Sequence, residues 1–200
     1  MEDKSSKNTR ARDVGLELAI GSEFAAIGLS VQYGGPLYPE PMLSIQNYDY
    51  AIQCKRASSS TERSLIKKLA AASRQIRRNC SDHPTVTSGA VVLDVTKTLN
   101  PGGSIHVNKI NRPQFCRMRE QHFELTKLCE SLMKFNKYPE VALLIIRATY
   151  LQSHRHDGLA NEWVCSKKYI PNPENMTLYE ALDRISPIQR TTGVGFGAVI

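Results

Sequence analysis

The spacing of apolar residues along the chain predicts alternating helices and strands. In some segments the apolar side chains recur every three or four residues, which is the spacing of one helix face. Other segments are nearly unbroken apolar runs, which are typical of strands buried on both faces of a sheet. The predicted helices cover residues 13–28, 61–79, 112–135 and 177–185, and the predicted strands cover residues 29–33, 42–46, 50–55, 88–96, 141–151 and 162–170.

The order of these elements, α-β-β-β-α-β-α-β-β-α, predicts the α/β class, with a mixed central sheet flanked by helices. Turn-forming residues separate the second strand from the third, so these two are expected to form a hairpin. No repeat and no long linker divides the chain. We expect one domain over residues 12–185, after a disordered basic lead-in over residues 1–11 and before a C-terminal tail over residues 186–200.

Composition and charge narrow the class of protein. The hydrophobic fraction of 41% and the charged fraction of 22% are ordinary for a folded domain. The formal net charge is +7, from 26 Lys and Arg against 19 Asp and Glu. This balance favours a polyanionic partner such as nucleic acid, although a solvated basic face gives the same composition.

The cysteines and the apolar runs exclude other classes. The five cysteines are odd in number and widely spaced, with no C-x-x-C pair, so neither a zinc site nor a disulfide framework is expected. The first residues lack the apolar core of a signal peptide, and no run reaches the roughly 18 apolar residues of a membrane span. We therefore expect a soluble, cytoplasmic protein with reduced thiols and no membrane partner.

The stretch YDYAIQCKR, residues 48–56, carries the most specific chemistry. Successive strand residues point to opposite faces, so Gln53 and Lys55 share one face while Ile52 and Cys54 enter the core on the other. In a cleft, the amide oxygen and the ammonium group would suit phosphodiester hydrolysis assisted by a hard cation. A half-exposed strand with alternating polar residues would show the same pattern.

The α-β-β-β-α-β order of residues 12–96, with Gln53-Cys54-Lys55 ending its third strand, resembles the core of the PD-(D/E)XK nuclease superfamily, the restriction-endonuclease-like fold. In that family an acidic residue on one hairpin strand is followed by (D/E/Q)-x-K on the next. The resemblance implies a metal-dependent nuclease that hydrolyses phosphodiester bonds in DNA. It implies that Lys55 is catalytic and that the cofactor is Mg²⁺ or Mn²⁺.

The acidic half of the family pattern departs from expectation. At the P-D position Pro41 is followed by Met42, and a thioether is a poor ligand for Mg²⁺. Glu40, two residues before Met42, is the nearest replacement carboxylate. Asp49 ranks below it because it lies in the turn.

The first predicted helix offers a further carboxylate, because many family members carry an acidic residue there that joins the metal site. Glu17 stands in a nearly all-apolar helix, where an unpaired carboxylate is costly. It either faces a cation or Lys55, or it faces water or pairs with Arg12 or another base. Glu23 is a second candidate for the same role. The resemblance thus implies Lys55, Gln53, Glu40 and Glu17 as catalytic residues, and Glu40, Gln53 and Glu17 as metal ligands.

The helix predicted over residues 61–79 is strongly basic. The resemblance implies that it flanks the active cleft, where Lys68 or Gln75 would touch a phosphate or orient Lys55. A solvated basic face is the alternative, and a binding face would make affinity strongly salt-dependent. The residues expected to bind nucleic acid are Lys68, Gln75, Arg56, Lys67 and Arg74.

Three other features have simpler interpretations. Asp94 and Thr96 end a buried strand, where α/β proteins often place functional groups, but capping of the strand end explains them equally. His122 lies on the apolar seam of its helix and is interpreted as a hydrogen-bonded core histidine. HRHD, residues 154–157, is interpreted as a loop.

Two functions remain open from the sequence. One is the metal-dependent DNA nuclease. The other is a catalytically inactive module of the same fold, which binds nucleic acid or acts as a subunit of a larger assembly; Met42 and Gln53, where the family has acids, favour it. A homodimer is a further open alternative.

Overall fold

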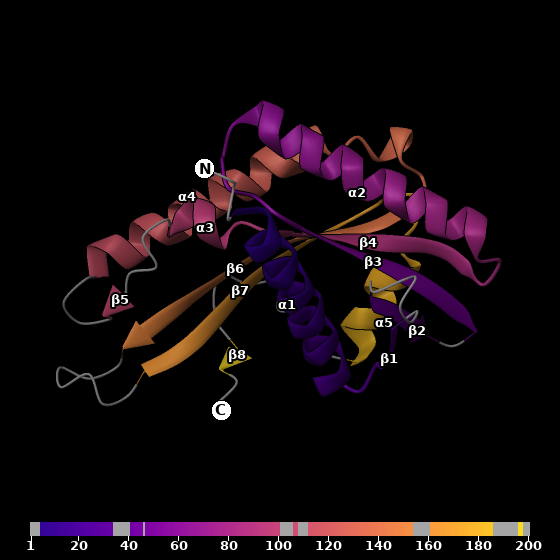
Figure 1. Ribbon diagram of the computed structural model, residues 1–200, viewed down its shortest axis with the longest axis horizontal. Helices are drawn as coiled ribbons and strands as arrows, with labels where there is room; N and C mark the ends of the chain where they lie inside the picture. Colours follow the sequence, from indigo (N-terminus) through magenta and orange to yellow (C-terminus); the bar gives the residue numbers. More distant parts are fainter. Residues whose placement is uncertain are drawn as a thin grey trace.

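The computed structural model describes residues 5–33, 41–45, 47–100, 106–107, 112–153, 161–185 and 196–197, and within them the side chains of residues 14–33, 41–45, 47–100, 116–149 and 167–184. These residues form one mixed β-sheet with helices on both faces (Figure 1). The predicted α/β class, with a mixed central sheet flanked by helices, is therefore confirmed.

The sheet joins an antiparallel half to a parallel half. Its strands are β1 (Ser30–Tyr33), β2 (Pro41–Ile45), β3 (Tyr48–Arg56), β4 (Val86–Asp94), β5 (His106–Val107), β6 (Val141–Ser153), β7 (Asn161–Pro171) and β8 (Phe196–Gly197). They lie in the order β1-β2-β3-β4-β6-β7-β8, and β5 pairs with the end of β6. β1, β2 and β3 run antiparallel, β3, β4 and β6 run parallel, and β7 returns antiparallel to β6. The carboxyl ends of β3, β4 and β6 therefore meet at one edge of the sheet.

Helices enclose the sheet in two layers, each with its own apolar core. α2 (Glu62–Asp82) and α4 (Arg112–Leu132) cover one face, and α1 (Ser5–Ala26) and α5 (Thr177–Ile185) cover the other (Figure 1). The short helix α3 (Thr96–Leu99) follows β4, and the 3-10 turn η1 (Phe135–Lys137) follows α4. Because both layers are filled, the middle strands are desolvated on both sides.

The observed helices and strands match the predicted ones, except at some of their ends. The α-β-β-β-α-β order is present from α1 to β4, and α5 has the predicted bounds. α1 begins at Ser5, earlier than expected, and so includes most of the segment interpreted as a lead-in. Of the predicted tail only Phe196–Gly197 is described, and HRHD, residues 154–157, lies outside the described residues.

The close approach of β3, β4 and α2 depends on a glycine. A Cβ atom at Gly89 of β4 would collide with the carbonyl oxygen of Ala51 on β3 and would press on Ile76 of α2. A residue without a side chain is thus required where the helix crosses the parallel pair. The same contact shows that Ile76 of α2 lies at the height of Ala51 along β3.

The histidine of α4 is a core residue, as the sequence predicted. His122 is buried against the sheet. Burial lowers its pKa to about 4, the charge of Lys168 acts in the same direction, and a hydrogen bond with the backbone of Ile146 partly opposes both. The imidazole is therefore neutral in the folded protein at pH 7.

We expect acid to destabilise the fold through His122. In the unfolded chain its pKa is about 6.5, so this stability is complete above pH 6.5, falls as the pH drops, and levels off below about 4. The full loss is on the order of 3 kcal/mol, and urea unfolding at several pH values measures it. In His122→Gln this part of the pH dependence should disappear. If the free energies of unfolding of the two proteins change with pH in parallel, His122 is not the group responsible.

Candidate functional site

Gln53 and Lys55 lie in the last half of β3 and point toward α2. Ile52 and Cys54, between and beside them, are buried in the core that α1 covers, and Ala51 is buried in the core that α2 covers. Alternation along the strand then directs Gln53 and Lys55 to the α2 side. The two residues share a face, as the sequence indicated, but this face is enclosed rather than open.

The amide of Gln53 is the least satisfied polar group on this strand. The residue is 1% exposed, and neither Oε1 nor Nε2 has a hydrogen-bond partner within the part of the chain that the structure describes. Its register neighbour on β4 is Val91, and the buried hydroxyl of Ser73 on α2 donates instead to the Leu69 carbonyl, at 2.8 Å. An unpartnered buried amide costs roughly 1–3 kcal/mol for each unsatisfied group, so a partner for this amide would stabilise the protein.

The candidate carboxylates are distributed unequally around this amide. Glu40 lies outside the described residues. Glu17 is half-buried on α1, the helix on the opposite face, and with burial, the larger cause, its charge raises the pKa of Cys54 to about 12. Asp49 is at the far end of β3 from Lys55 and accepts a hydrogen bond from Ser44 Oγ at 2.7 Å. Of the candidate carboxylates that the structure describes, Glu17 and Asp49, neither lies beside Gln53.

The chemistry of Gln53 fits a hard cation in part. An amide oxygen is a suitable ligand for Mg²⁺, and this one is buried without a partner. No group of three or more His, Cys, Asp or Glu side chains that could hold a metal occurs among the described residues. The negative charge that a divalent ion needs is expected from Glu40, which lies outside the described residues, or from Glu17.

Two of the basic residues of α2 form ion pairs with acids. Arg77 pairs with Glu140 at 3.2 Å and Arg78 with Asp82 at 3.3 Å. Lys68 is half-buried in the second turn of the helix, near the carboxyl end of β3 from which the chain enters α2. The other residues predicted to bind nucleic acid on this helix, Lys67, Arg74 and Gln75, are exposed.

Gln75 is next to Ile76, which lies at the level of Ala51, well before Lys55 along the strand. Of the two residues considered for orienting Lys55, Lys68 is therefore the better placed. For Gln75, only the prediction that it contacts a phosphate remains.

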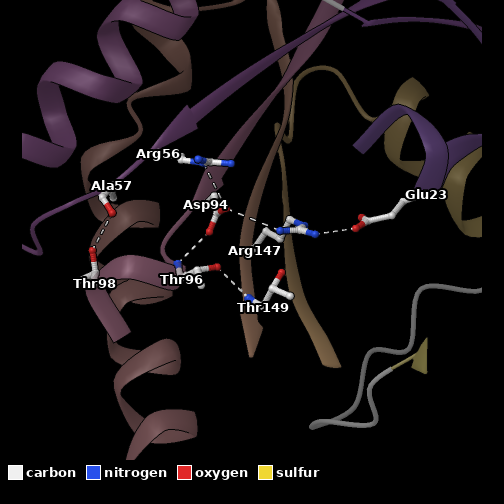
Figure 2. Close-up of polar contacts among 8 residues, drawn as sticks. All are labelled: Glu23, Arg56, Ala57, Asp94, Thr96, Thr98, Arg147 and Thr149. Carbon is white, nitrogen blue, oxygen red and sulfur yellow. Dashed lines mark hydrogen bonds and ion pairs between the residues drawn. The ribbon is translucent and has the colours of Figure 1, made fainter. Parts of the chain in front are cut away.

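A chain of ion pairs crosses the other face of the sheet at the carboxyl ends of the parallel strands (Figure 2). Arg56 Nε lies 3.9 Å from Asp94 Oδ2, which is 3.7 Å from Arg147 Nη1. Arg147 Nη2 lies 2.8 Å from Glu23 Oε1, and Lys167 Nζ lies 2.6 Å from Glu23 Oε2. We call these five residues the ion-pair chain; it connects β3, β4, β6, β7 and α1.

The middle of the ion-pair chain is buried and its ends are partly exposed. The side chains of Asp94 and Arg147 are each 9% exposed, whereas that of Arg56 is 34% exposed and that of Lys167 is 26% exposed. Burial by itself raises the pKa of Glu23, but Lys167 and Arg147 outweigh it and the pKa is lowered. Glu23 is therefore ionised and structural, and it is not the metal ligand that the sequence left open.

Hydrogen bonds fix the turn that follows β4. Thr96 N–H donates to Asp94 Oδ1 at 2.8 Å, and Thr149 N–H donates to Thr96 Oγ1 at 2.9 Å. Thr98 Oγ1 donates to the Ala57 carbonyl at 3.1 Å (Figure 2). Capping of the strand end, one of the two interpretations of Asp94 and Thr96, is thus realised, and it ties β3, β4 and β6 together.

The sequence contained one signal for the ion-pair chain that was missed. Arg147 is the single charged residue in the apolar run VALLIIRATYL, residues 141–151. A charge inside a strand that is buried on both faces requires a partner, so this run predicts an ion pair at Arg147. It did not identify Glu23, which is more than a hundred residues away.

A surface cavity of about 590 Å³ lies between α3, α4 and the segment after β3. Its lining residues are Ser60, Thr98, Leu99, Arg117, Glu120, Gln121, Glu124, Leu125 and Leu128. Glu120 and Glu124 outnumber the one cation, Arg117, so the lining does not favour a phosphate.

Comparisons of the chain with protein-family models, with curated proteins and with solved structures give no match. Over the described residues, none of the helices combines the length and the apolar character needed to cross a lipid bilayer.

Replacing Gln53 by methionine is expected to stabilise the protein. The thioether has nearly the volume of the amide and leaves no buried group unsatisfied, so the free energy of unfolding should rise by about 1–2 kcal/mol in urea titrations. Gln75→Met is the matched control on an exposed position, with an expected change within about 0.5 kcal/mol. A clear loss of stability in Gln53→Met would show that the amide has a partner in the apo protein.

Proposed function

We propose that the chain is a metal-dependent nuclease that hydrolyses phosphodiester bonds in DNA. The observation that carries the proposal is the unpartnered, fully buried amide of Gln53 with Lys55 on the same strand face. Its setting supports it: an antiparallel β1-β2-β3 meander followed by a parallel β4 is the arrangement of a nuclease-like α-β-β-β-α-β core.

Each proposed role follows from the chemistry of the side chain. Lys55 would hold the attacking water or the charge that develops on the phosphate. Gln53 and Glu40 would hold Mg²⁺ or Mn²⁺, which lowers the pKa of a bound water and neutralises phosphate charge. Glu40 is chosen because it precedes Met42 by two residues, and Met42 pairs with Ala51, two residues before Gln53.

Glu17 takes second place among the proposed ligands. It belongs to α1, and its charge acts on Cys54, whose side chain is on the face opposite Gln53. A role in the metal site would require it to reach the edge of the sheet where β3 ends.

Exposed cations support DNA as the substrate class. Arg63, Lys67 and Arg74 project from α2, and the chain as a whole carries a formal charge of +7. Phosphate contacts by such side chains give affinity that depends little on sequence and strongly on salt.

A second function, a nuclease-like module that binds nucleic acid without cutting it, is favoured by a different observation. The described residues hold no carboxylate cluster, and Met42 stands where the family pattern has an acid. In this case the protein would act alone or as a subunit of a larger assembly through the same basic helix.

Cleavage of a fluorescent duplex and of supercoiled plasmid in Mg²⁺ or Mn²⁺ distinguishes the two functions. We expect Lys55→Ala to lower the rate at least about 100-fold, because it removes a group that acts in the transition state, and Glu40→Gln to lower it similarly. Lys134→Ala, which removes an exposed lysine between α4 and η1, is the control and should keep the wild-type rate. Equal cleavage by wild type and Lys55→Ala excludes the mechanism, and tight binding without cleavage selects the module.

The basic face of α2 gives a separate binding prediction. Lys67→Ala and Arg74→Ala should each weaken DNA binding and reduce the slope of log K against log salt by about one, because each removes one phosphate contact. Fluorescence anisotropy in EDTA at several salt concentrations measures the slope, and Lys134→Ala should leave it unchanged. If both variants have the slope of the wild type, the DNA-binding face is not on α2.

A further inference from the structure

The end of β3 carries a cation on each side of the sheet. Lys55 points to the α2 side, and Arg56, the next and last residue of the strand, pairs with Asp94 on the α1 side. Ligands of open α/β sheets bind beyond the carboxyl ends of parallel strands, which is where both side chains project. Two successive cations therefore flank the edge at which the proposed site lies.

Hydrogen bonds connect the residues around Arg56. The backbone N–H of Ala57, directly after it, donates to the Asp94 carbonyl at 2.8 Å. The carboxylate of Asp94 is fixed in turn, because Oδ1 accepts from Thr96 N–H at 2.8 Å and Oδ2 faces the buried Arg147. The Arg56 side chain thus lies beside a carboxylate that is itself held by two contacts.

The guanidinium of Arg56 is held without being neutralised. Its contact with Asp94, at 3.9 Å, is an ion pair too long for a hydrogen bond. Asp94 also faces the buried Arg147, so its charge is shared between two guanidinium groups. The half-exposed Arg56 can therefore still present positive charge to an anion at the edge of the sheet.

We propose that Arg56 binds a backbone phosphate next to the one held at Lys55, and that Asp94 is its positioning residue. A nucleic-acid strand would then cross the carboxyl edge of the sheet, with Lys55 on one side and Arg56 on the other. This inference rests on the proposed function, because it needs a nucleic acid at Lys55. It assigns to Asp94 a role in binding beyond its role in capping the strand.

The sign of one mutational effect tests the role of Asp94. Removing a carboxylate near a bound polyanion ordinarily strengthens binding, because a repulsion is lost. If Asp94 positions Arg56, Asp94→Asn weakens binding instead, and it does so only while Arg56 is present. Asparagine keeps an oxygen for the N–H of Thr96, so the turn after β4 can still form.

Anisotropy of a fluorescent DNA oligonucleotide, with the full chain in EDTA and at several salt concentrations, measures these effects. We expect Arg56→Ala to weaken binding about tenfold and to reduce the salt slope by about one. Asp94→Asn should weaken binding about threefold to tenfold, and the double variant should bind like Arg56→Ala. The matched control is Asp82→Asn, which removes the acid paired with Arg78 on α2 and should bind as tightly as the wild type or more tightly.

Each outcome decides the inference. If Asp94→Asn binds as tightly as the wild type, the positioning role is overturned. If Arg56→Ala has the affinity and the salt slope of the wild type, the phosphate contact is overturned. In both cases, DNA binding by the wild type leaves the proposed function standing. Absence of binding by the wild type overturns both proposals. If Asp94→Asn is unfolded by circular dichroism, Asp94→Glu takes its place, because it keeps the charge beside Arg147 and displaces the carboxylate; unchanged affinity in that variant overturns the positioning role.

Discussion

Desolvation of the β3–β4 pair on both faces is the constraint on which the rest of this structure depends. α1 and α2 cover the two sides, and apolar side chains of both layers fill the space between helix and strand. A polar group that enters this region loses water and must recover its hydrogen bonds or its charge partner from protein or ligand. The parallel pairing also sends the carboxyl ends of the strands to one edge, so the polar groups that remain gather there.

The two faces meet this constraint in different ways. On the α1 side, Arg147 forms ion pairs with Asp94 and Glu23, so that each charge lies beside an opposite one and the first helix is tied to the sheet. On the α2 side, Gln53 is enclosed with no partner among the described residues. A folded protein tolerates few such groups, and those it retains are concentrated where it binds something. The contrast is the physical basis for placing the proposed site at Gln53 and the proposed scaffold at Asp94.

The distribution of charge joins these two faces into one proposed surface. Arg77 and Arg78 are exposed and pair with acids, and cations nearer the start of α2, close to the edge where β3 ends, are exposed as well. Under the proposed function, negative charge beside Gln53 decides whether this surface cuts nucleic acid or only holds it. A neutral amide alone binds a divalent ion weakly, so the carboxylate at position 40 is the deciding group.

Much of the fold was determined by local sequence. Unbroken apolar runs predicted β4 and β6, the helical spacing of leucines and isoleucines predicted α2, and strand alternation put Gln53 and Lys55 on one face. These features depend on periodicity and on the loss of water, which act between neighbours in the chain. The ends of elements were less well determined, since α1 extends to Ser5, and the sequence did not anticipate α3, β5, η1 or β8.

Only the tertiary structure decided the partners. It enclosed Gln53 under α2, placed Glu17 on the helix of the opposite face, and paired Arg147 with Glu23 rather than with any near neighbour. A sequence specifies which side chains must leave water, because that follows from residue type and period. It does not specify which of them meet, because that depends on the order of strands and on the faces that the helices cover.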